Sequence, residues 1–99
     1  MNNHQWTPSQ SAFLKAYEEA KNNDPIFLYG PSGSGKSYVC EGNGICHIDA
    51  YTYFRQPELI RNVYKVVVYD VEPPPENQKD KFQIVFHMEK LPHDIDPGS

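Results

Sequence analysis

A glycine-rich stretch in the first half of the chain has the residue types and spacing of a phosphate-binding loop. Residues 30–37 fit the pattern G-x-x-x-x-G-K-[ST]. Glycines there let backbone N–H groups turn onto phosphate oxygens, which side chains would block. The Lys36 ammonium would neutralise the β- and γ-phosphates of ATP, and the Ser37 hydroxyl would ligate Mg²⁺. The expected contacts to the nucleotide are Gly30, Pro31, Ser32, Gly33, Ser34, Gly35, Lys36, Ser37 and Tyr38.

A second candidate group follows an apolar run further along the chain. In "VVVYDVE" four apolar residues lead into Asp70, which is the Walker B pattern. A carboxylate at that strand end would lie beside Ser37 and support the Mg²⁺ through water. The alternative interpretation is an ordinary buried strand with an acidic residue at its exit.

Hydrolysis of ATP would need a group that activates water, and Glu72 is the candidate, acting with Lys36 as the catalytic pair. The position directly after Asp70 is occupied by Val71, so the glutamate is displaced by one residue. Alternate residues of a strand share one face, so Glu72 would point with Asp70 unless the strand has already ended. His87, at the end of "IVFHM", is the candidate that contacts the γ-phosphate, and a surface histidine is the alternative.

The elements needed to position these groups can be predicted from the pattern. "TPSQSAFLKAYEEAKNND" predicts a helix capped by Thr7 or Ser9, with an apolar face of Phe13, Leu14 and Tyr17. A continuous apolar run predicts a strand at residues 26–29, buried on both faces of a parallel sheet. A short helix should start at Lys36 and end early at glycines.

The second half of the chain predicts further strands separated by short helices. We expect a strand over residues 45–54 or ending near Asp49, a short helix over 57–63, and strands over 65–71 and 82–88. "EPPPENQKDK", between the last two strands, should form a loop with at most one helical turn. Trp6, Tyr51, Tyr53 and Phe54 could form a stacking platform for single-stranded nucleic acid, although core packing is the favoured interpretation.

Composition limits the classes of protein to consider. The 99 residues suit one domain. The net charge of −4 argues against nucleic-acid binding over the whole surface. Two cysteines are too few for a disulfide framework and fit a reducing, cytoplasmic location. No apolar run approaches the roughly 20 residues of a membrane span, and the N-terminus does not have the pattern of a secretory signal.

Residues 24–95 resemble the AAA+ class of P-loop ATPases. Three segments carry the resemblance, in this order: the strand with its phosphate-binding loop, "KVVVYDVE" and "QIVFHMEKLPHDI". The similarity is to replication initiators, helicase loaders and clamp-loader subunits, in which a basic residue and a proline often follow the sensor strand, as Lys90 and Pro92 do here. The resemblance implies a small three-layer α/β core with a mostly parallel four-stranded sheet of order 1-4-3-2. Outside that range, the pattern of the sequence assigns residues 1–23 to an N-terminal helix and 96–99 to a disordered tail.

The chain also departs from that family. The helices after the loop and before the sensor strand are very short, the lid domain is absent, and Arg55 and Arg61 are the only arginines. The resemblance implies an ATP-binding module in DNA replication, with slow or partner-dependent hydrolysis, a protein partner or homo-oligomer, and DNA contacted through an assembly. The alternatives are a non-hydrolysing module that binds or inhibits a replication ATPase, a fragment like a viral superfamily 3 helicase, and a small phosphotransferase. The missing lid arginines and the acid of the Walker B pattern disfavour the phosphotransferase.

Overall fold

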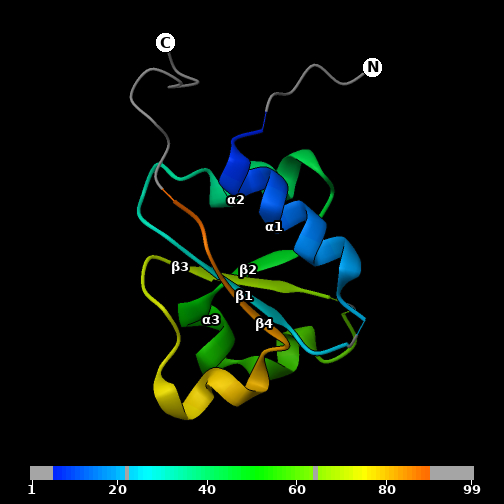
Figure 1. Ribbon diagram of the computed structural model, residues 1–99. Coiled ribbons are helices and arrows are strands. Elements are labelled where there is room, and N and C mark those ends of the chain that lie inside the picture. The colour runs from blue at the N-terminus through cyan, green and yellow to red at the C-terminus, as the bar shows by residue number, and fades with distance from the viewer. Residues whose placement is uncertain (1–5, 22, 64, 90–99) are drawn as a thin grey trace.

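The computed structural model describes residues 6–21, 23–63 and 65–89, and its centre is a four-stranded parallel sheet (Figure 1). The order across the sheet is β2-β3-β1-β4. Three pairings, β1 with β3, β1 with β4 and β2 with β3, are all parallel. The strands are β1 (Ile26–Tyr29), β2 (His47–Asp49), β3 (Val67–Asp70) and β4 (Ile84–His87). The predicted α/β class with a four-stranded sheet is therefore confirmed.

Helices cover both faces of this sheet, which gives three layers. In Figure 1, α1 and α2 lie above the sheet, and α3 lies below it. Two short 3₁₀ helices, η1 and η2, connect the later elements. The helices are α1 (Pro8–Glu19), α2 (Lys36–Gly42), α3 (Ala50–Arg55), η1 (Pro57–Ile60) and η2 (Glu76–Lys81).

Alternation along β1 and β3 divides the core into two apolar clusters. Ile26 and Leu28 face α1 and α2, whereas Phe27 points to the other face, toward Ala50 and Tyr53 of α3. Every other residue of a strand points to the same side, so a continuous apolar run fills both clusters. The prediction that residues 26–29 are buried on both faces is confirmed, because all but Tyr29 are buried.

The N-terminal helix belongs to this same core. Thr7 caps α1 by accepting a hydrogen bond from the Gln10 backbone N–H, and the Gln10 side chain accepts one from the Thr7 N–H. Phe13 is fully buried and meets the ring of Phe86 in β4 edge-on at 5.7 Å between centroids. The predicted cap and apolar face of the helix are confirmed.

The predicted strand order of 1-4-3-2 is wrong. β3 pairs directly with β1, and β4 pairs with the opposite side of β1 instead of lying between them. The end of the connecting segment fixes this placement. The ring of Phe82 packs edge-on against Phe27 at 5.0 Å, and the Gln83 N–H donates to the Pro25 carbonyl at 3.0 Å. Both contacts place the start of β4 on the side of β1 that β3 does not occupy.

Two local predictions also need correction. The second strand stops at Asp49, as one of the two predictions had it, and residues 50–55 form α3 in place of further strand. The Asp49 carboxylate caps this helix, and Ala50 and Tyr53 bury the same face. Helical spacing thus overrides the strand preference of the aromatic residues. The predicted helix at 57–63 is the shorter η1.

Residues 90–99 are not among the described residues. The predicted tail at 96–99 and the end of the predicted core at 90–95 lie outside the described residues. Of the helices described, none has the length and apolar character needed to cross a membrane.

Replacing Phe13 with alanine tests whether α1 is part of the core. The substitution should lower the free energy of unfolding by about 3–5 kcal/mol, because it leaves a cavity between α1 and the sheet. Urea denaturation followed by circular dichroism measures this loss. Leu59→Ala, at a residue that is 54% exposed on η1, is the control and should change stability by less than about 0.5 kcal/mol. Equal losses in both variants would place α1 outside the cooperative core.

Candidate nucleotide-binding cleft

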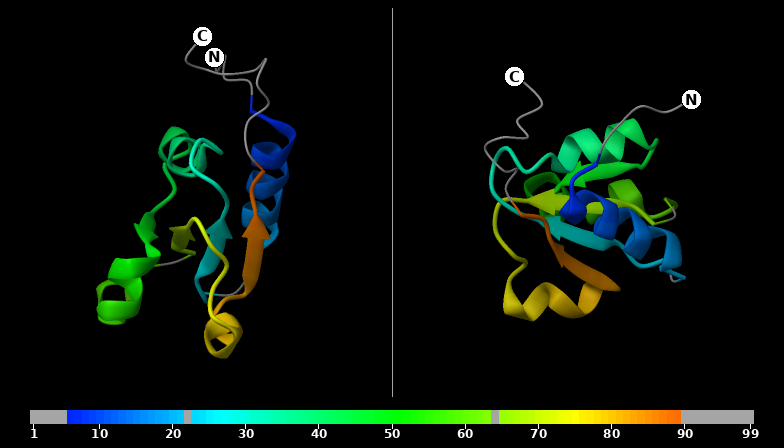
Figure 2. Two further views of the ribbon diagram at one scale, coloured as in Figure 1. Left: turned by 90° about the vertical axis from the view of Figure 1, so that its left-hand side faces the viewer. Right: turned by 45° about the horizontal axis from the view of Figure 1, so that its top comes forward.

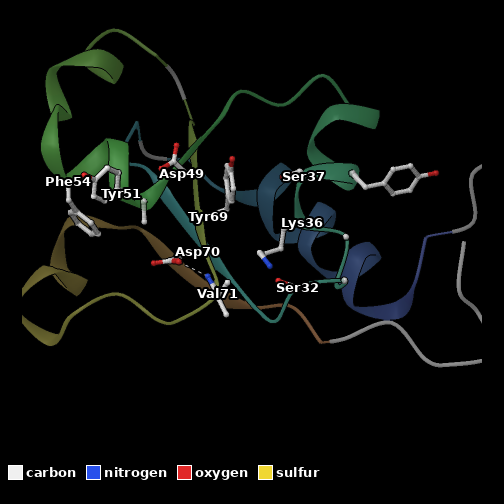
Figure 3. Close-up of a pocket in the computed structure, with 13 residues that line it drawn as sticks. Ser32, Lys36, Ser37, Asp49, Tyr51, Phe54, Tyr69, Asp70 and Val71 are labelled. Carbon is white, nitrogen blue, oxygen red and sulfur yellow. Dashed lines mark hydrogen bonds between the residues drawn. The ribbon is translucent and has the colours of Figure 1, made fainter. Parts of the chain in front are cut away.

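The segments at the carboxyl ends of β1, β2 and β3 line one cleft of about 660 Å³. Figure 2 shows the strand arrows pointing to the same edge of the sheet. That volume lies in the range of sites for small molecules. The cleft is lined by Ser32, Gly33, Gly35, Lys36, Ser37, Tyr38, Asp49, Ala50, Tyr51, Phe54, Tyr69, Asp70 and Val71 (Figure 3). The structure thus brings the predicted loop and Asp70 together.

Two glycines of the phosphate-binding loop occupy places where no other residue fits. A Cβ atom on Gly30 would lie 2.2 Å from the Met88 carbonyl oxygen, so the loop can leave β1 only without a side chain at that position. Gly35 has a φ of +83°, which L-residues rarely adopt. The sequence interpretation of these glycines rested on phosphate access, and the structure adds packing as a second reason.

The loop is held from behind by α1. The Gln10 side chain is 2% exposed, and its amide Nε2 donates to the Ser34 carbonyl at 3.4 Å. The same Nε2 lies 2.2 Å from the place where a Cβ on Gly35 would stand. Ser34, from the middle of the loop, is fully buried. Gln10 is a supporting residue that the sequence analysis did not identify, because its only sequence signal was its place in the capping box.

The Lys36 ammonium is oriented by the loop itself. Its Nζ donates to the carbonyl oxygens of Gly30 at 2.6 Å and Pro31 at 3.1 Å, and to the Ser34 hydroxyl at 3.2 Å. These three acceptors match the three N–H donors of an ammonium group. Partial burial lowers the pKa of Lys36, and the nearby charge of Asp70 opposes that shift. Phosphate binding must therefore exchange some of these bonds for bonds to phosphate oxygens.

Asp70 lies at the end of β3, directly beside the strand that leads into the loop. Its backbone carbonyl accepts from the Gly30 N–H at 3.1 Å, which ties the start of the loop to the end of β3. Its side-chain Oδ1 accepts from the Val71 N–H at 2.6 Å (Figure 3). The carboxylate is exposed to solvent, so it can turn toward a cation in the cleft.

The oxygen donors in the cleft suit Mg²⁺. This ion is usually held by one or two protein ligands, with phosphate oxygens and waters completing the octahedron. Ser37 and Asp70 line the same cleft and supply a hydroxyl and a carboxylate. No cluster of three or more metal-ligating His, Cys, Asp or Glu side chains exists in the described part of the chain. Ser37 and Asp70 are the cleft residues that could hold such an ion.

Five predicted site residues are not among those that line the cleft. Gly30, Pro31 and Ser34 belong to the loop beside it, whereas Glu72 and His87 lie on other segments. β3 ends at Asp70, so the argument that alternate strand residues share a face does not extend to Glu72, which is exposed. His87 is exposed at the end of β4, where its ring stacks on Tyr29 at 4.7 Å between centroids. The described residues that line the cleft include neither of them.

Asp49 is a cleft residue that the sequence analysis did not assign to the site. It ends β2 as Asp70 ends β3, and in the parallel register it lies opposite Tyr69. Its carboxylate accepts two hydrogen bonds from Thr52, from the backbone N–H at 3.0 Å and from the hydroxyl at 2.9 Å. These bonds lower the pKa of Asp49, so the side chain stays charged. An acidic residue at a strand end was the signal that could have identified it.

Gln10→Glu tests whether α1 shapes the loop. The glutamate keeps an acceptor for the Thr7 N–H but has no amide to donate to Ser34, so both stability and ATP affinity should fall. A buried acceptor left unpaired costs about 1–3 kcal/mol. Thr7→Ala is the control, because it removes the helix cap at a cost of about 1 kcal/mol without touching the loop. Chemical denaturation and ATP titration of both variants measure the effects, and equal ATP affinities would contradict the role of Gln10.

Comparison with known proteins adds no relative to this description. No protein-family model matches the chain, and neither a curated protein nor a solved structure does. The cleft is therefore the feature from which a function can be inferred. The loop, the ammonium of Lys36, the hydroxyl of Ser37 and the carboxylate of Asp70 are the groups that it brings together.

Proposed function

We propose that the chain binds ATP with Mg²⁺ through the phosphate-binding loop and hydrolyses it slowly. The observation that carries this proposal is that Lys36, Ser37 and Asp70 line a single cleft. A cation, a hydroxyl and a carboxylate at the carboxyl edge of a parallel sheet are suited to a metal-bound polyphosphate. A role in DNA replication or in helicase or clamp loading, with a partner subunit and DNA in the assembly, rests on the sequence resemblance alone.

Each loop group has a defined part in this proposal. The Lys36 ammonium, already directed by three loop acceptors, would move its bonds to the β- and γ-phosphates. Ser37, at the start of α2, would ligate Mg²⁺ directly, and Asp70 would hold it through water. When bound, the metal would neutralise charge on the phosphates. Backbone N–H groups of the loop would bind the remaining phosphate oxygens.

Slow turnover follows from what the cleft lacks within the described residues. Neither Glu72 nor an arginine lines it. Arginine that contacts the transferring phosphoryl group can contribute about 10³–10⁵ in rate.

The strand order supports the AAA+ resemblance less than the loop does, because the resemblance implied a strand between β1 and β3. A non-hydrolysing module that binds a replication ATPase therefore remains the second candidate.

ATP with Mg²⁺ should raise the melting temperature of the chain. At a ligand concentration of about 100 times the dissociation constant, binding stabilises the folded state by about 2.7 kcal/mol. Lys36→Ala should abolish the rise, since it removes the ammonium that meets the phosphates. Lys15→Ala, on the exposed side of α1, is the matched control and should keep it. Differential scanning fluorimetry makes the measurement. An unchanged melting curve at millimolar ATP would refute the proposal.

The isolated chain should hydrolyse ATP at well under about one turnover per minute, which is slow for an enzyme. Phosphate release under multiple turnover measures the rate. Asp70→Asn should lower it further, because the amide supports Mg²⁺ less well than a carboxylate does. Rapid hydrolysis by the isolated chain would contradict the proposed deficit.

Glu72→Gln tests the remaining candidate for activating water. If Glu72 has that role, the variant should bind ATP as the parent does and lose turnover, both alone and with any subunit that supplies an arginine. Equal turnover in variant and parent would remove Glu72 from the catalytic assignment. ATP titration and phosphate release on the same preparations separate the two outcomes.

A further inference from the structure

The cleft has a second half that differs chemically from the phosphate-binding loop. It is formed by the end of β2, by α3 and by the end of β3. Figure 3 shows Asp49, Tyr51 and Phe54 on the opposite side of the cleft from Ser37 and Ser32, with Tyr69 and Val71 between the two groups. The side chains of this half are aromatic or apolar apart from Asp49. Asp70 adjoins them at the end of β3, and the Arg55 guanidinium bonds the Tyr51 hydroxyl. The members of this half are Asp49, Ala50, Tyr51, Phe54, Tyr69 and Val71.

The Asp49 carboxylate decides what this half can accept. Its two bonds from Thr52 hold it in place and keep it ionised. An ionised carboxylate repels phosphate oxygens, so this half does not suit a polyphosphate. Each carboxylate oxygen can still accept a further hydrogen bond. A neutral group that donates, such as a hydroxyl, is the partner that fits.

The aromatic side chains define the shape of that partner. Tyr51 is 69% exposed, so core packing does not explain its position. The Arg55 guanidinium steadies it by bonding the Tyr51 hydroxyl and by lying 5.1 Å from the ring centroid. Phe54 is anchored edge-on against buried Tyr53 at 5.1 Å. With Tyr69, these rings suit a flat ring, which stacks on aromatic faces.

We propose that this half of the cleft, the acceptor subsite (Asp49, Tyr51, Phe54 and Tyr69), binds an uncharged nucleoside and presents its hydroxyl to the γ-phosphate of ATP. A nucleoside combines a flat ring with hydroxyl donors and carries no charge that Asp49 would repel. The proposal rests on the proposed binding of ATP at the loop. It makes the chain a small phosphotransferase, an alternative that the sequence had disfavoured for its lack of lid arginines and for the acid of its Walker B pattern.

The transfer is balanced without a further reactant. The nucleoside hydroxyl oxygen forms a bond to the γ-phosphorus while the bond from that phosphorus to the bridging oxygen breaks. ADP leaves with the electron pair of the broken bond. The hydroxyl proton passes to Asp49 and then to water. The products are a nucleoside monophosphate, ADP and one proton.

Calorimetric titration tests the subsite directly. Adenosine, guanosine, cytidine and uridine are each titrated into the chain, alone and with Mg²⁺ and an ATP analogue whose β–γ bridging oxygen is a methylene. At least one nucleoside should bind. Asp49→Asn should weaken it about tenfold or more, because the bond to a charged acceptor is lost. Asparagine caps a helix as well as aspartate does, so α3 should persist.

A ring variant and a control complete the design. Tyr51→Leu should weaken nucleoside binding about fivefold or more, since stacking on the ring is lost. Leu59 lies outside the cleft, so the Leu59→Ala variant should bind the nucleoside as tightly as the parent does. With ATP in place of the analogue, chromatography should detect the nucleoside monophosphate, and Asp49→Asn should reduce its yield.

The outcomes separate this proposal from the binding of ATP. If no nucleoside binds under either condition, or if Asp49→Asn binds it as tightly as the parent, the subsite is refuted. If Asp49→Asn and Tyr51→Leu instead weaken binding of the ATP analogue, these residues hold the nucleoside part of ATP itself. The acceptor proposal is then wrong. If a nucleoside binds in an Asp49-dependent way while the analogue does not bind, the subsite stands and the proposed ATP function fails.

Discussion

Parallel pairing of β1 with a neighbour on each side is the constraint on which the rest of the structure depends. β3 and β4 pair with the same four residues of β1, in register with Tyr29 opposite both Asp70 and His87. Three strands therefore end at one level and deliver their following segments to one edge of the sheet. The phosphate-binding loop can meet a carboxylate from β3 only because the two strands are direct neighbours running the same way.

The shape of the loop depends on segments far from it in the chain. The Met88 carbonyl, just after β4, lies where a side chain on residue 30 would be, and the Gln10 amide of α1 lies behind residue 35. The Met88 N–H donates to the Tyr29 carbonyl at 2.7 Å, which holds that approach. The first helix and the last strand are thus part of the site's framework. This explains why α1 shares the core and is not an appendage.

Charge divides the cleft into two chemically different ends. Lys36 provides the cation at the loop, and the ionised Asp49 provides an anion near the aromatic rings. Asp70 ends β3, the strand next to the loop, and lines the same cleft. In the proposed function, a polyphosphate would favour the end with Lys36, and a neutral hydrogen-bond donor would favour the end with Asp49.

The sequence by itself determined the local features: the capped first helix, the buried strand, the glycine-rich loop, and Lys36, Ser37 and Asp70 as its chemical groups. These follow from spacing, capping and apolar runs, which are properties of neighbouring residues. Only the tertiary structure decided the strand order, the end of β3 before Glu72, the place of His87 on the far side of β1 and the entry of Asp49 into the cleft. Apolar runs do not encode which strands will be neighbours. That choice arises from contacts between distant residues, such as Phe82 on Phe27.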